Sequence, residues 1–197
     1  MVFNLFGGAT SYIISALITL SVVAVFVAIF IDFVIYNSKN TVKKSRRSIV
    51  ATGSMIGFYV VYYFVLRYRI GGLYFIDPYI IIIGTAMIVA GAVFNILGRI
   101  QLKGNWANHI KIYEGHSLVN RGIYKVVRHP LYASIMLMLF GGSIAYRNWL
   151  SAVLTAFVFI PFMYYRAKQE ETLLQEEFAE YEEYKKTTGM FFPKLWK

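Results

Sequence analysis

Residues 11–36 read SYIISALITLSVVAVFVAIFIDFVIY, and no side chain from Met1 to Ile31 is charged. This apolar stretch is much longer than the apolar core of a cleaved signal peptide. It also exceeds the ~20 residues that a helix needs to cross a bilayer. We therefore expect the first helix to remain in the protein and to span a membrane.

The composition indicates a membrane setting for the whole chain. Hydrophobic residues make up 58% of the 197 positions and charged residues 15%, and the mean hydropathy is +0.55. That is more apolar side chain than one soluble core of this length buries. Because no polar linker separates the apolar stretches, residues 1–197 are predicted to form a single membrane-embedded domain.

Further apolar stretches predict further crossings. The last two are each roughly 25 Å long as helices and are separated only by Arg147 and Asn148, which predicts a short, tight hairpin. Tyr146 and Trp149 flank this turn and suit a bilayer surface. No strand pattern is visible, so the predicted fold is all-α and polytopic, with five transmembrane helices. After the first, they run from about Ile49 to Leu66, Pro78 to Leu97, Leu131 to Tyr146 and Trp149 to Tyr165.

The distribution of charge predicts the orientation. Twenty Lys and Arg against ten Asp and Glu give a net charge of +10, which suits nucleic acid or an anionic membrane surface. The hydropathy favours membrane lipids as partners over nucleic acid. Basic residues concentrate after the first and third helices, whereas the opposite loops hold only Arg67, Arg69 and Arg147. The N-terminus is therefore expected outside, with the loop before the fourth helix and the C-terminal tail in the cytoplasm.

The tail is amphipathic. Apolar and aromatic residues recur at helical spacing after Gln169, which predicts that the fifth helix extends into the cytosol. Its remaining acidic residues are expected to form a solvated face: Glu176, Glu177, Glu180, Glu182 and Glu183.

Several chemistries are excluded. The chain has no cysteine and three histidines, so it lacks disulfides, thiolate nucleophiles and a Cys- or His-rich metal site, and no metal is expected. Neither a P-loop nor a GxGxxG after a strand is present.

The loop before the fourth helix is the remaining candidate for chemistry. It holds His116-Ser117-Leu118-Val119, then Tyr124, and then Arg128-His129-Pro130-Leu131-Tyr132. Pro130 suits the first turn of a helix, so an ordinary helix start also explains part of this pattern. Arg166 and Glu170, one turn apart, form either a local ion pair or part of a polar pocket at the same membrane face.

These residues resemble the isoprenylcysteine carboxyl methyltransferase family, and the chain looks like a short prokaryotic member. The resemblance covers about residues 99–193. It rests on Leu118-Val119, Gly122-Ile123-Tyr124, Arg128-His129-Pro130 with Tyr132, and then Arg166 and Glu170-Glu171, followed by Leu174, Phe178, Tyr181, Tyr184 and Pro193.

The resemblance implies transfer of a methyl group from S-adenosyl-L-methionine to the carboxylate of a prenylated C-terminal cysteine or a similar lipid carboxylate that enters from the bilayer. It implies a cytosolic cofactor pocket formed by the loop before the fourth helix and the helical tail. Arg166 takes the acceptor-carboxylate position. The cofactor-binding positions are His116, Ser117, Leu118, Val119, Tyr124, His129, Pro130, Leu131, Tyr132 and Glu170.

The sequence departs from the family pattern at a few positions. Ser134 and Ala179 stand where many relatives have glycine, and we expect this difference to affect how the helices pack. His109 lies where glutamine is common, so we leave it out of the predicted site.

Two other functions stay open. A phospholipid or other lipid amine N-methyltransferase would share the cofactor loop, but the cationic Arg166 would repel an ammonium acceptor. A non-enzymatic membrane scaffold or transporter would explain the hydropathy and the charge bias alone.

Overall fold

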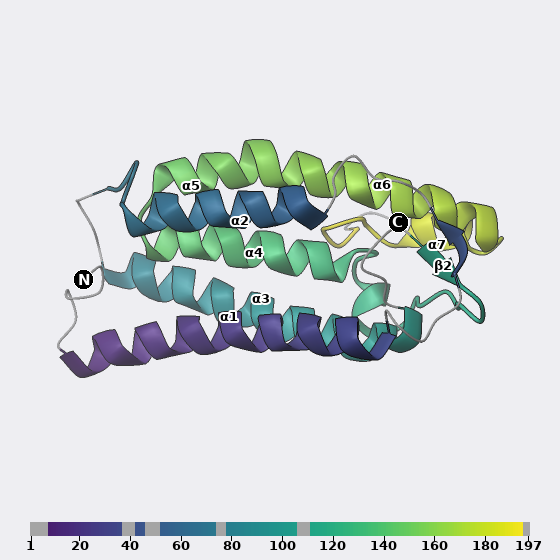
Figure 1. The fold of residues 1–197 in the computed structure, drawn as a ribbon, viewed down its shortest axis with the longest axis horizontal. Helices are drawn as coiled ribbons and strands as arrows, with labels where there is room; N and C mark the ends of the chain where they lie inside the picture. Colours follow the sequence, from purple (N-terminus) through teal and green to yellow (C-terminus); the bar gives the residue numbers. More distant parts are fainter. Residues whose placement is uncertain (1–7, 37–41, 46–51, 74–77, 106–110, 195–197) are drawn as a thin grey trace.

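The computed structural model describes residues 8–36, 42–45, 52–73, 78–105 and 111–194. Long helices lie along one common direction and make up most of the structure (Figure 1). The helices are α1 (Gly8–Tyr36), α2 (Thr52–Arg67), α3 (Pro78–Leu102), α4 (Pro130–Ala145), α5 (Trp149–Leu154), α6 (Ile160–Glu177) and α7 (Tyr181–Thr187). Shorter elements are β1 (Val42–Ser45), β2 (Lys111–Tyr113), the 3-10 turns η1 (Lys103–Asn105) and η2 (Gly122–Lys125), and the π turn η3 (Thr155–Phe159).

Each predicted apolar stretch forms a helix. By length and composition, three helices can cross a bilayer: Gly8–Ile35, Tyr79–Leu102 and the continuous helix Trp149–Glu177. The apolar helices Gly53–Arg67 and Pro130–Ala145 are shorter. The helical membrane architecture is thus confirmed, and the count of five crossings stays a prediction.

Elements α5, η3 and α6 run on as one helix with a π turn in the middle. Pro161 is the second residue after this turn. A proline inside a helix has no N–H to donate and its ring collides with the carbonyl four residues earlier, here that of Phe157. The wider π turn accommodates this, so the helix continues without a break.

Helices α3 and α4 form the centre of the bundle, and glycines let their backbones touch. Gly84, Gly91 and Gly98 recur every seventh residue along α3. A Cβ atom at Gly84 would lie 2.6 Å from the carbonyl oxygen of Gly141, and one at Gly91 would lie 2.9 Å from that of Ser134. Small residues at such contacts are the usual means of close helix packing in membranes.

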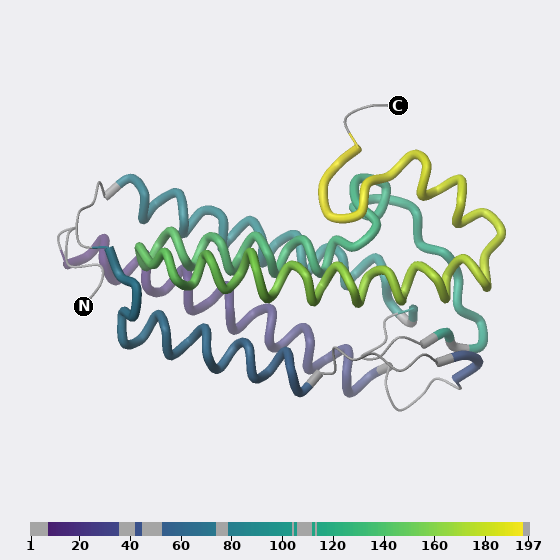
Figure 2. Tube along the Cα trace, turned by 90° about the horizontal axis from the view of Figure 1, so that it is seen from above, coloured from purple at the N-terminus to yellow at the C-terminus, as the bar shows by residue number. Residues whose placement is uncertain are grey.

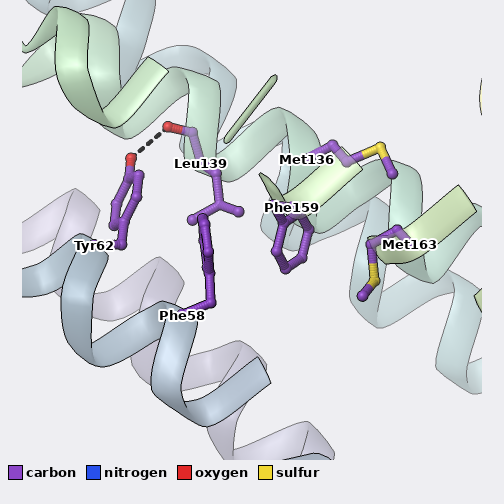
Figure 3. Close-up of a cluster of buried hydrophobic side chains, with 6 residues drawn as sticks. All are labelled: Phe58, Tyr62, Met136, Leu139, Phe159 and Met163. Atoms are coloured by element: carbon purple, nitrogen blue, oxygen red, sulfur yellow. Dashed lines mark hydrogen bonds between the residues drawn. The ribbon is translucent and has the colours of Figure 1, made fainter. Parts of the chain in front are cut away.

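The outer helices pack on this central pair. Ile14 and Ile18 of α1 join a buried cluster with Ile81 and Ile88 of α3. On the other side, aromatic residues of α2 pack on α4 and on the α5–α6 helix (Figure 3). This second cluster consists of Phe58, Tyr62, Met136, Leu139, Phe159 and Met163.

Two short strands correct the expectation that the chain has none. Strands β1 and β2 pair antiparallel, with Lys44 opposite Ile112. The buried Ile112 packs against Leu173 of α6, which fastens this ribbon to the end of the long helix. Lys43 and Lys44 also pair with Glu177. Glu177 is therefore half-buried in an ion-pair cluster and does not belong to the solvated face, whereas the other four glutamates of that face are exposed.

The tail turns back where a continuous helix was expected. Helix α6 ends because Phe178 adopts an extended backbone (φ −120°, ψ 111°), and the exposed Ala179 lies in the turn rather than in a helix contact. After α7, the segment 188–194 folds back towards the bundle; we call it the C-terminal hook (Figure 2). Its Gly189 carbonyl accepts a 2.8 Å hydrogen bond from the Arg128 N–H.

The predicted tight turn between α4 and α5 is confirmed, but its polar residues are buried. Arg147 is 8% exposed and Asn148 is 3% exposed. The Asn148 side chain caps α5 by accepting from the Ser151 N–H at 2.9 Å, and it donates to the Ile70 carbonyl at 2.9 Å. Packing against the end of α2 therefore buries a turn that the sequence predicts at a surface.

Candidate functional site

A cavity of about 450 Å³ lies at the end of the bundle where the hook folds back. This volume falls within the range of sites for small molecules and cofactors. Every residue that the sequence analysis assigned to the site lines this cavity: His116, Ser117, Leu118, Val119, Tyr124, His129, Pro130, Leu131, Tyr132, Arg166 and Glu170. The structure therefore brings together residues that are up to 54 positions apart in the sequence, from His116 to Glu170.

The start of α4 lines one part of the cavity. Pro130 occupies the first turn of α4, as predicted, and His129 precedes it with a non-helical backbone (φ −122°, ψ 64°). The His129 ring stacks on Tyr132 one turn later, with ring centres 5.6 Å apart and planes 8° apart. The N–H of His129 donates to the Met190 carbonyl of the hook at 3.0 Å. The hook thus fixes the backbone at the entrance to α4.

Two carboxylates face the His129 imidazole. Nε2 lies 3.2 Å from Glu171 Oε1, and Nδ1 lies 3.5 Å from Glu170 Oε2. Burial alone would lower the pKa of His129, but the hydrogen bonds and charges of the two glutamates outweigh it and raise that pKa above its usual value. The geometry favours an imidazolium cation.

Glu171 is a residue of this site that the sequence analysis missed. It is 1% exposed, and its Oε1 accepts from Arg128 Nε at 2.8 Å as well as facing His129. Arg128 also donates to the Thr188 carbonyl of the hook. The adjacent acidic pair Glu170-Glu171 was visible in the sequence, but only the structure separates the two: Glu170 lines the cavity and Glu171 lies behind it.

Tyr132 connects Glu170 with Arg166. The Tyr132 hydroxyl donates to Glu170 Oε1 and accepts from Arg166 Nε at 3.0 Å. Arg166 Nε also lies 3.7 Å from Glu170 Oε1. The local ion pair that the spacing allowed is therefore present, and it is part of a larger polar group at the cavity wall.

The loop 116–119 is held by an amide that the sequence analysis did not single out. Asn105, at the end of η1, accepts from the Ser117 N–H at 3.0 Å and donates to the Ser117 hydroxyl at 3.2 Å. Gln101 of α3 similarly accepts from the Ile123 N–H at 2.8 Å. The side-chain amides of Gln101 in α3 and Asn105 in η1 thus hold the backbone at Ile123 and Ser117. Burial lowers the pKa of His116, and the charge of Glu177 opposes this.

Tyr124 presents a buried aromatic ring to the cavity. Its carbonyl accepts from the Tyr184 hydroxyl of α7. Burial raises the pKa of Tyr124, with a further contribution from the Glu170 charge, so the phenol stays neutral. Tyr181 and Tyr184 of α7 also line the cavity, which explains why aromatic residues recur in the tail.

A second ion pair lies on the α1 side of the cavity. Arg99 lines the cavity, and its Nη1 lies 2.6 Å from Asp32, the acidic residue of α1. Arg99 Nε donates to Asn95 at 2.8 Å, and Asn95 donates to Ser134 of α4 at 2.7 Å. Ser134, one of the departures from the family pattern, is therefore a hydrogen-bond partner within the helix packing.

Apolar residues of α1 and α2 form the remaining wall. Phe26, Ile29, Met55 and Ile56 line the cavity, and Arg166 Nη1 lies 4.0 Å from the sulfur of Met55. Arg166 therefore stands at the border between the polar and apolar walls. His109 lies outside the described residues.

Comparison with known proteins identifies the family of this region. Residues 82–176 match the isoprenylcysteine carboxyl methyltransferase (ICMT) family. A probable protein-S-isoprenylcysteine O-methyltransferase from Oryza sativa subsp. indica is 30% identical over 105 residues, which are 52% of this chain and 55% of the relative. Protein-S-isoprenylcysteine O-methyltransferase B from Arabidopsis thaliana is 32% identical over 104 residues, 51% of this chain and 53% of the relative.

A second Arabidopsis thaliana protein, protein-S-isoprenylcysteine O-methyltransferase A, is 31% identical over 113 residues, 56% of this chain and 57% of the relative. The chain thus spans about half the length of the relatives that it matches. The matched segment contains α4, most of α3 and α6, and the cavity-lining residues from Arg99 to Leu174, whereas the lining residues of α1, α2 and α7 lie outside it. The resemblance seen in the sequence is confirmed: the segment 82–176, just under half of the chain, matches the isoprenylcysteine carboxyl methyltransferase family.

Proposed function

We propose that this protein is an integral membrane, S-adenosylmethionine-dependent methyltransferase that methylates the carboxylate of a prenylcysteine-like lipid. The observation that carries the proposal is the position of Arg166, at the border between a polar wall and an apolar wall of one cavity. A lipid-modified carboxylate needs that combination: a cation for its head and an apolar surface for its tail.

The residues of the polar wall fit S-adenosylmethionine. This ligand carries a sulfonium cation, and both the face of an aromatic ring and a carboxylate stabilise such a cation. Tyr124, Tyr132 and Glu170 supply these groups at the cavity wall. When bound, the cofactor supplies an electrophilic methyl group for attack by an acceptor oxygen. The start of α4 would hold an anionic part of the ligand.

Arg166 would orient the acceptor. Its guanidinium is held on one side by Tyr132, so it is positioned before a substrate arrives, and a planar guanidinium pairs well with a carboxylate. A carboxylate is already ionised at neutral pH, so this step needs no strong general base. The protein's contribution is alignment of the two reactants and exclusion of water.

The apolar wall would receive the lipid tail. Phe26 and Ile29 belong to α1 and Met55 and Ile56 to α2, and both helices expose many large apolar side chains. A tail that enters from the bilayer would lie along these residues. In the proposed orientation the N-terminus is outside and the cavity faces the cytoplasm, where the basic loops lie.

The lipid amine alternative is disfavoured by charge. Three arginines line the cavity: Arg99, Arg128 and Arg166. Because Arg99 is paired with Asp32 and Arg128 with Glu171, the charge that an acceptor meets at the border with the apolar wall is that of Arg166, which attracts a carboxylate and repels a protonated amine.

A methyl-transfer assay tests the proposal. Purified protein would be given radiolabelled S-adenosylmethionine together with a prenylcysteine, an unprenylated cysteine derivative, a fatty acid or phosphatidylethanolamine. We expect base-labile label, a methyl ester, on the prenylcysteine above all others. Label in phosphatidylethanolamine would favour the amine alternative, and no label in any acceptor, with no thermal stabilisation by the cofactor, would contradict the proposal.

A further inference from the structure

Glu171 is buried, charged and set back from the reacting groups. It is 1% exposed, and it is not among the described residues that line the cavity. A carboxylate buried in this way needs strong partners to remain charged. Its partners are Arg128 Nε at 2.8 Å and His129 Nε2 at 3.2 Å, and both face the same oxygen, Oε1.

His129 connects Glu171 with the cavity wall. Its other nitrogen, Nδ1, lies 3.5 Å from Oε2 of Glu170, and Glu170 lines the cavity. A neutral imidazole donates from only one nitrogen, whereas an imidazolium donates from both. Only the cation therefore satisfies the two carboxylates at once.

The geometry points to Glu171 as a positioning residue: it holds His129 as a cation, and His129 in turn holds the Glu170 carboxylate at the cavity wall. This inference rests on the proposed function, because it assigns Glu170 to the cofactor. Glu171 itself touches neither reactant.

The surroundings of His129 favour the cation. The titratable and charged side chains around the imidazole come from four segments. They are Glu170, Glu171 and Arg166 of α6, Arg128 of the preceding loop, Tyr132 of α4, and Tyr181 of α7, which lies beside Arg128 and Glu171. The hook contributes the apolar ring of Phe191 and the Met190 carbonyl. Two carboxylates act on the imidazole directly, while Arg166 reaches it only through Tyr132 and Glu170.

A purely structural role for Glu171 is the rival explanation. Arg128 binds the carbonyls of Lys185 and Thr188, so Glu171 could act only by fastening Arg128 and the hook. The two explanations predict opposite effects of removing Arg128. If electrostatics control the protonation of His129, the loss of the neighbouring Arg128 cation raises the pH midpoint of His129. If Glu171 acts only by fastening Arg128 and the hook, the same loss loosens His129, and its pH midpoint falls towards the value of an exposed histidine, about 6.5.

Histidine-selective NMR tests this directly. The chain has three histidines, so the full-length protein in nanodiscs gives few signals, and His129→Gln identifies the relevant one. We would record the pH midpoint of His129 in Glu171→Gln, Glu171→Asp, Arg128→Gln and the control Glu183→Gln, whose residue is exposed. Affinity for S-adenosylhomocysteine would be measured over the same pH range.

We expect Glu171→Gln to lower the midpoint by about one to three pH units, Glu171→Asp to restore most of it, and Arg128→Gln to raise it. The control should leave it unchanged, and the pH dependence of S-adenosylhomocysteine affinity should follow the midpoint in each variant. An unmoved midpoint in Glu171→Gln, or a lowered one in Arg128→Gln, overturns the inference. Failure of the unmodified protein to bind S-adenosylhomocysteine would count against the proposed function, and the NMR midpoints would then decide the inference alone.

Discussion

Arg166 Nε donates a 3.0 Å hydrogen bond to the hydroxyl oxygen of Tyr132, across the contact between α6 and α4. The hydroxyl proton is directed at Glu170, so the oxygen presents a lone pair to the guanidinium. Arg166 is 5% exposed, and this bond fixes its orientation at the cavity wall.

Replacing Arg166 should impair catalysis more than cofactor binding. A charge-assisted hydrogen bond contributes roughly 1.5 to 3 kcal/mol, so Arg166→Ala should lower kcat/KM for a prenylcysteine by about ten- to a hundredfold. Arg166→Lys should cost less, because it keeps the charge and loses the bidentate geometry. Steady-state kinetics and a cofactor titration measure the two effects separately, with the exposed Arg121→Ala as control. Loss of cofactor binding in Arg166→Ala would contradict the acceptor role.

Neutralising Glu170 should weaken cofactor binding. Glu170→Gln removes the carboxylate that the proposed function places beside the sulfonium, and a contact of this kind at a buried wall is worth more than one at an exposed surface. We expect about a tenfold or larger rise in Kd for S-adenosylmethionine, measured by calorimetry. Glu182→Gln, at an exposed site, should leave Kd unchanged. Equal effects of the two substitutions would show that α6 does not contribute to the cofactor site.

The close contact of α3 and α4 should make Gly84 intolerant of a side chain. A Cβ atom there would collide with backbone atoms of Gly141 and Ala145, and overpacking of this kind costs about 1 to 3 kcal/mol. Gly84→Ala should therefore lower Tm in detergent by several degrees. Gly57→Ala is the matched control, because nothing lies within 4 Å of its added Cβ. If both variants melt alike, the helices do not pack as described.

His129 should make stability fall with rising pH. Its pKa is raised in the folded protein, against burial, by Glu170 and Glu171. The folded state therefore binds a proton more tightly than the unfolded state. That contribution is complete below about pH 6.5, the unfolded value, and is lost as the pH rises through the folded-state pKa. Melting curves from pH 6 upward should show a decline in Tm that His129→Gln reduces. An identical slope in the variant would refute the ionic role of His129.

Side-specific labelling tests the proposed orientation. Because the chain has no cysteine, a single engineered cysteine reports its own side of the membrane. Thr10→Cys, at the start of α1, should react with an impermeant maleimide on intact cells. Asn120→Cys, in the loop that precedes α4, should react only after lysis. The reverse pattern would invert the topology, and reaction of both on intact cells would reduce the number of crossings.

The helices could be predicted because an apolar chain in a bilayer has few alternatives to helix. Pro78 and Pro130 marked the starts of α3 and α4, and the family resemblance selected residues that line one cavity. The contacts of Asp32 with Arg99 and of Asn105 with Ser117 could not be predicted, because each depends on how separate segments meet. The β1–β2 pair escaped notice for the same reason: two short polar segments become strands only beside each other.

The π turn at Thr155–Phe159 has a consequence for every residue that follows it. It holds one residue more than an α-helical turn, and one residue corresponds to a rotation of about 100° around the helix axis. Arg166 and Glu170 lie beyond the π turn, and its extra residue determines the side of the helix on which they lie, which is the side that faces the cavity. Deleting one residue from this segment would keep every site side chain and yet turn both away from the cavity. The length of the segment is therefore as much a part of the site as the identities of the residues that line it.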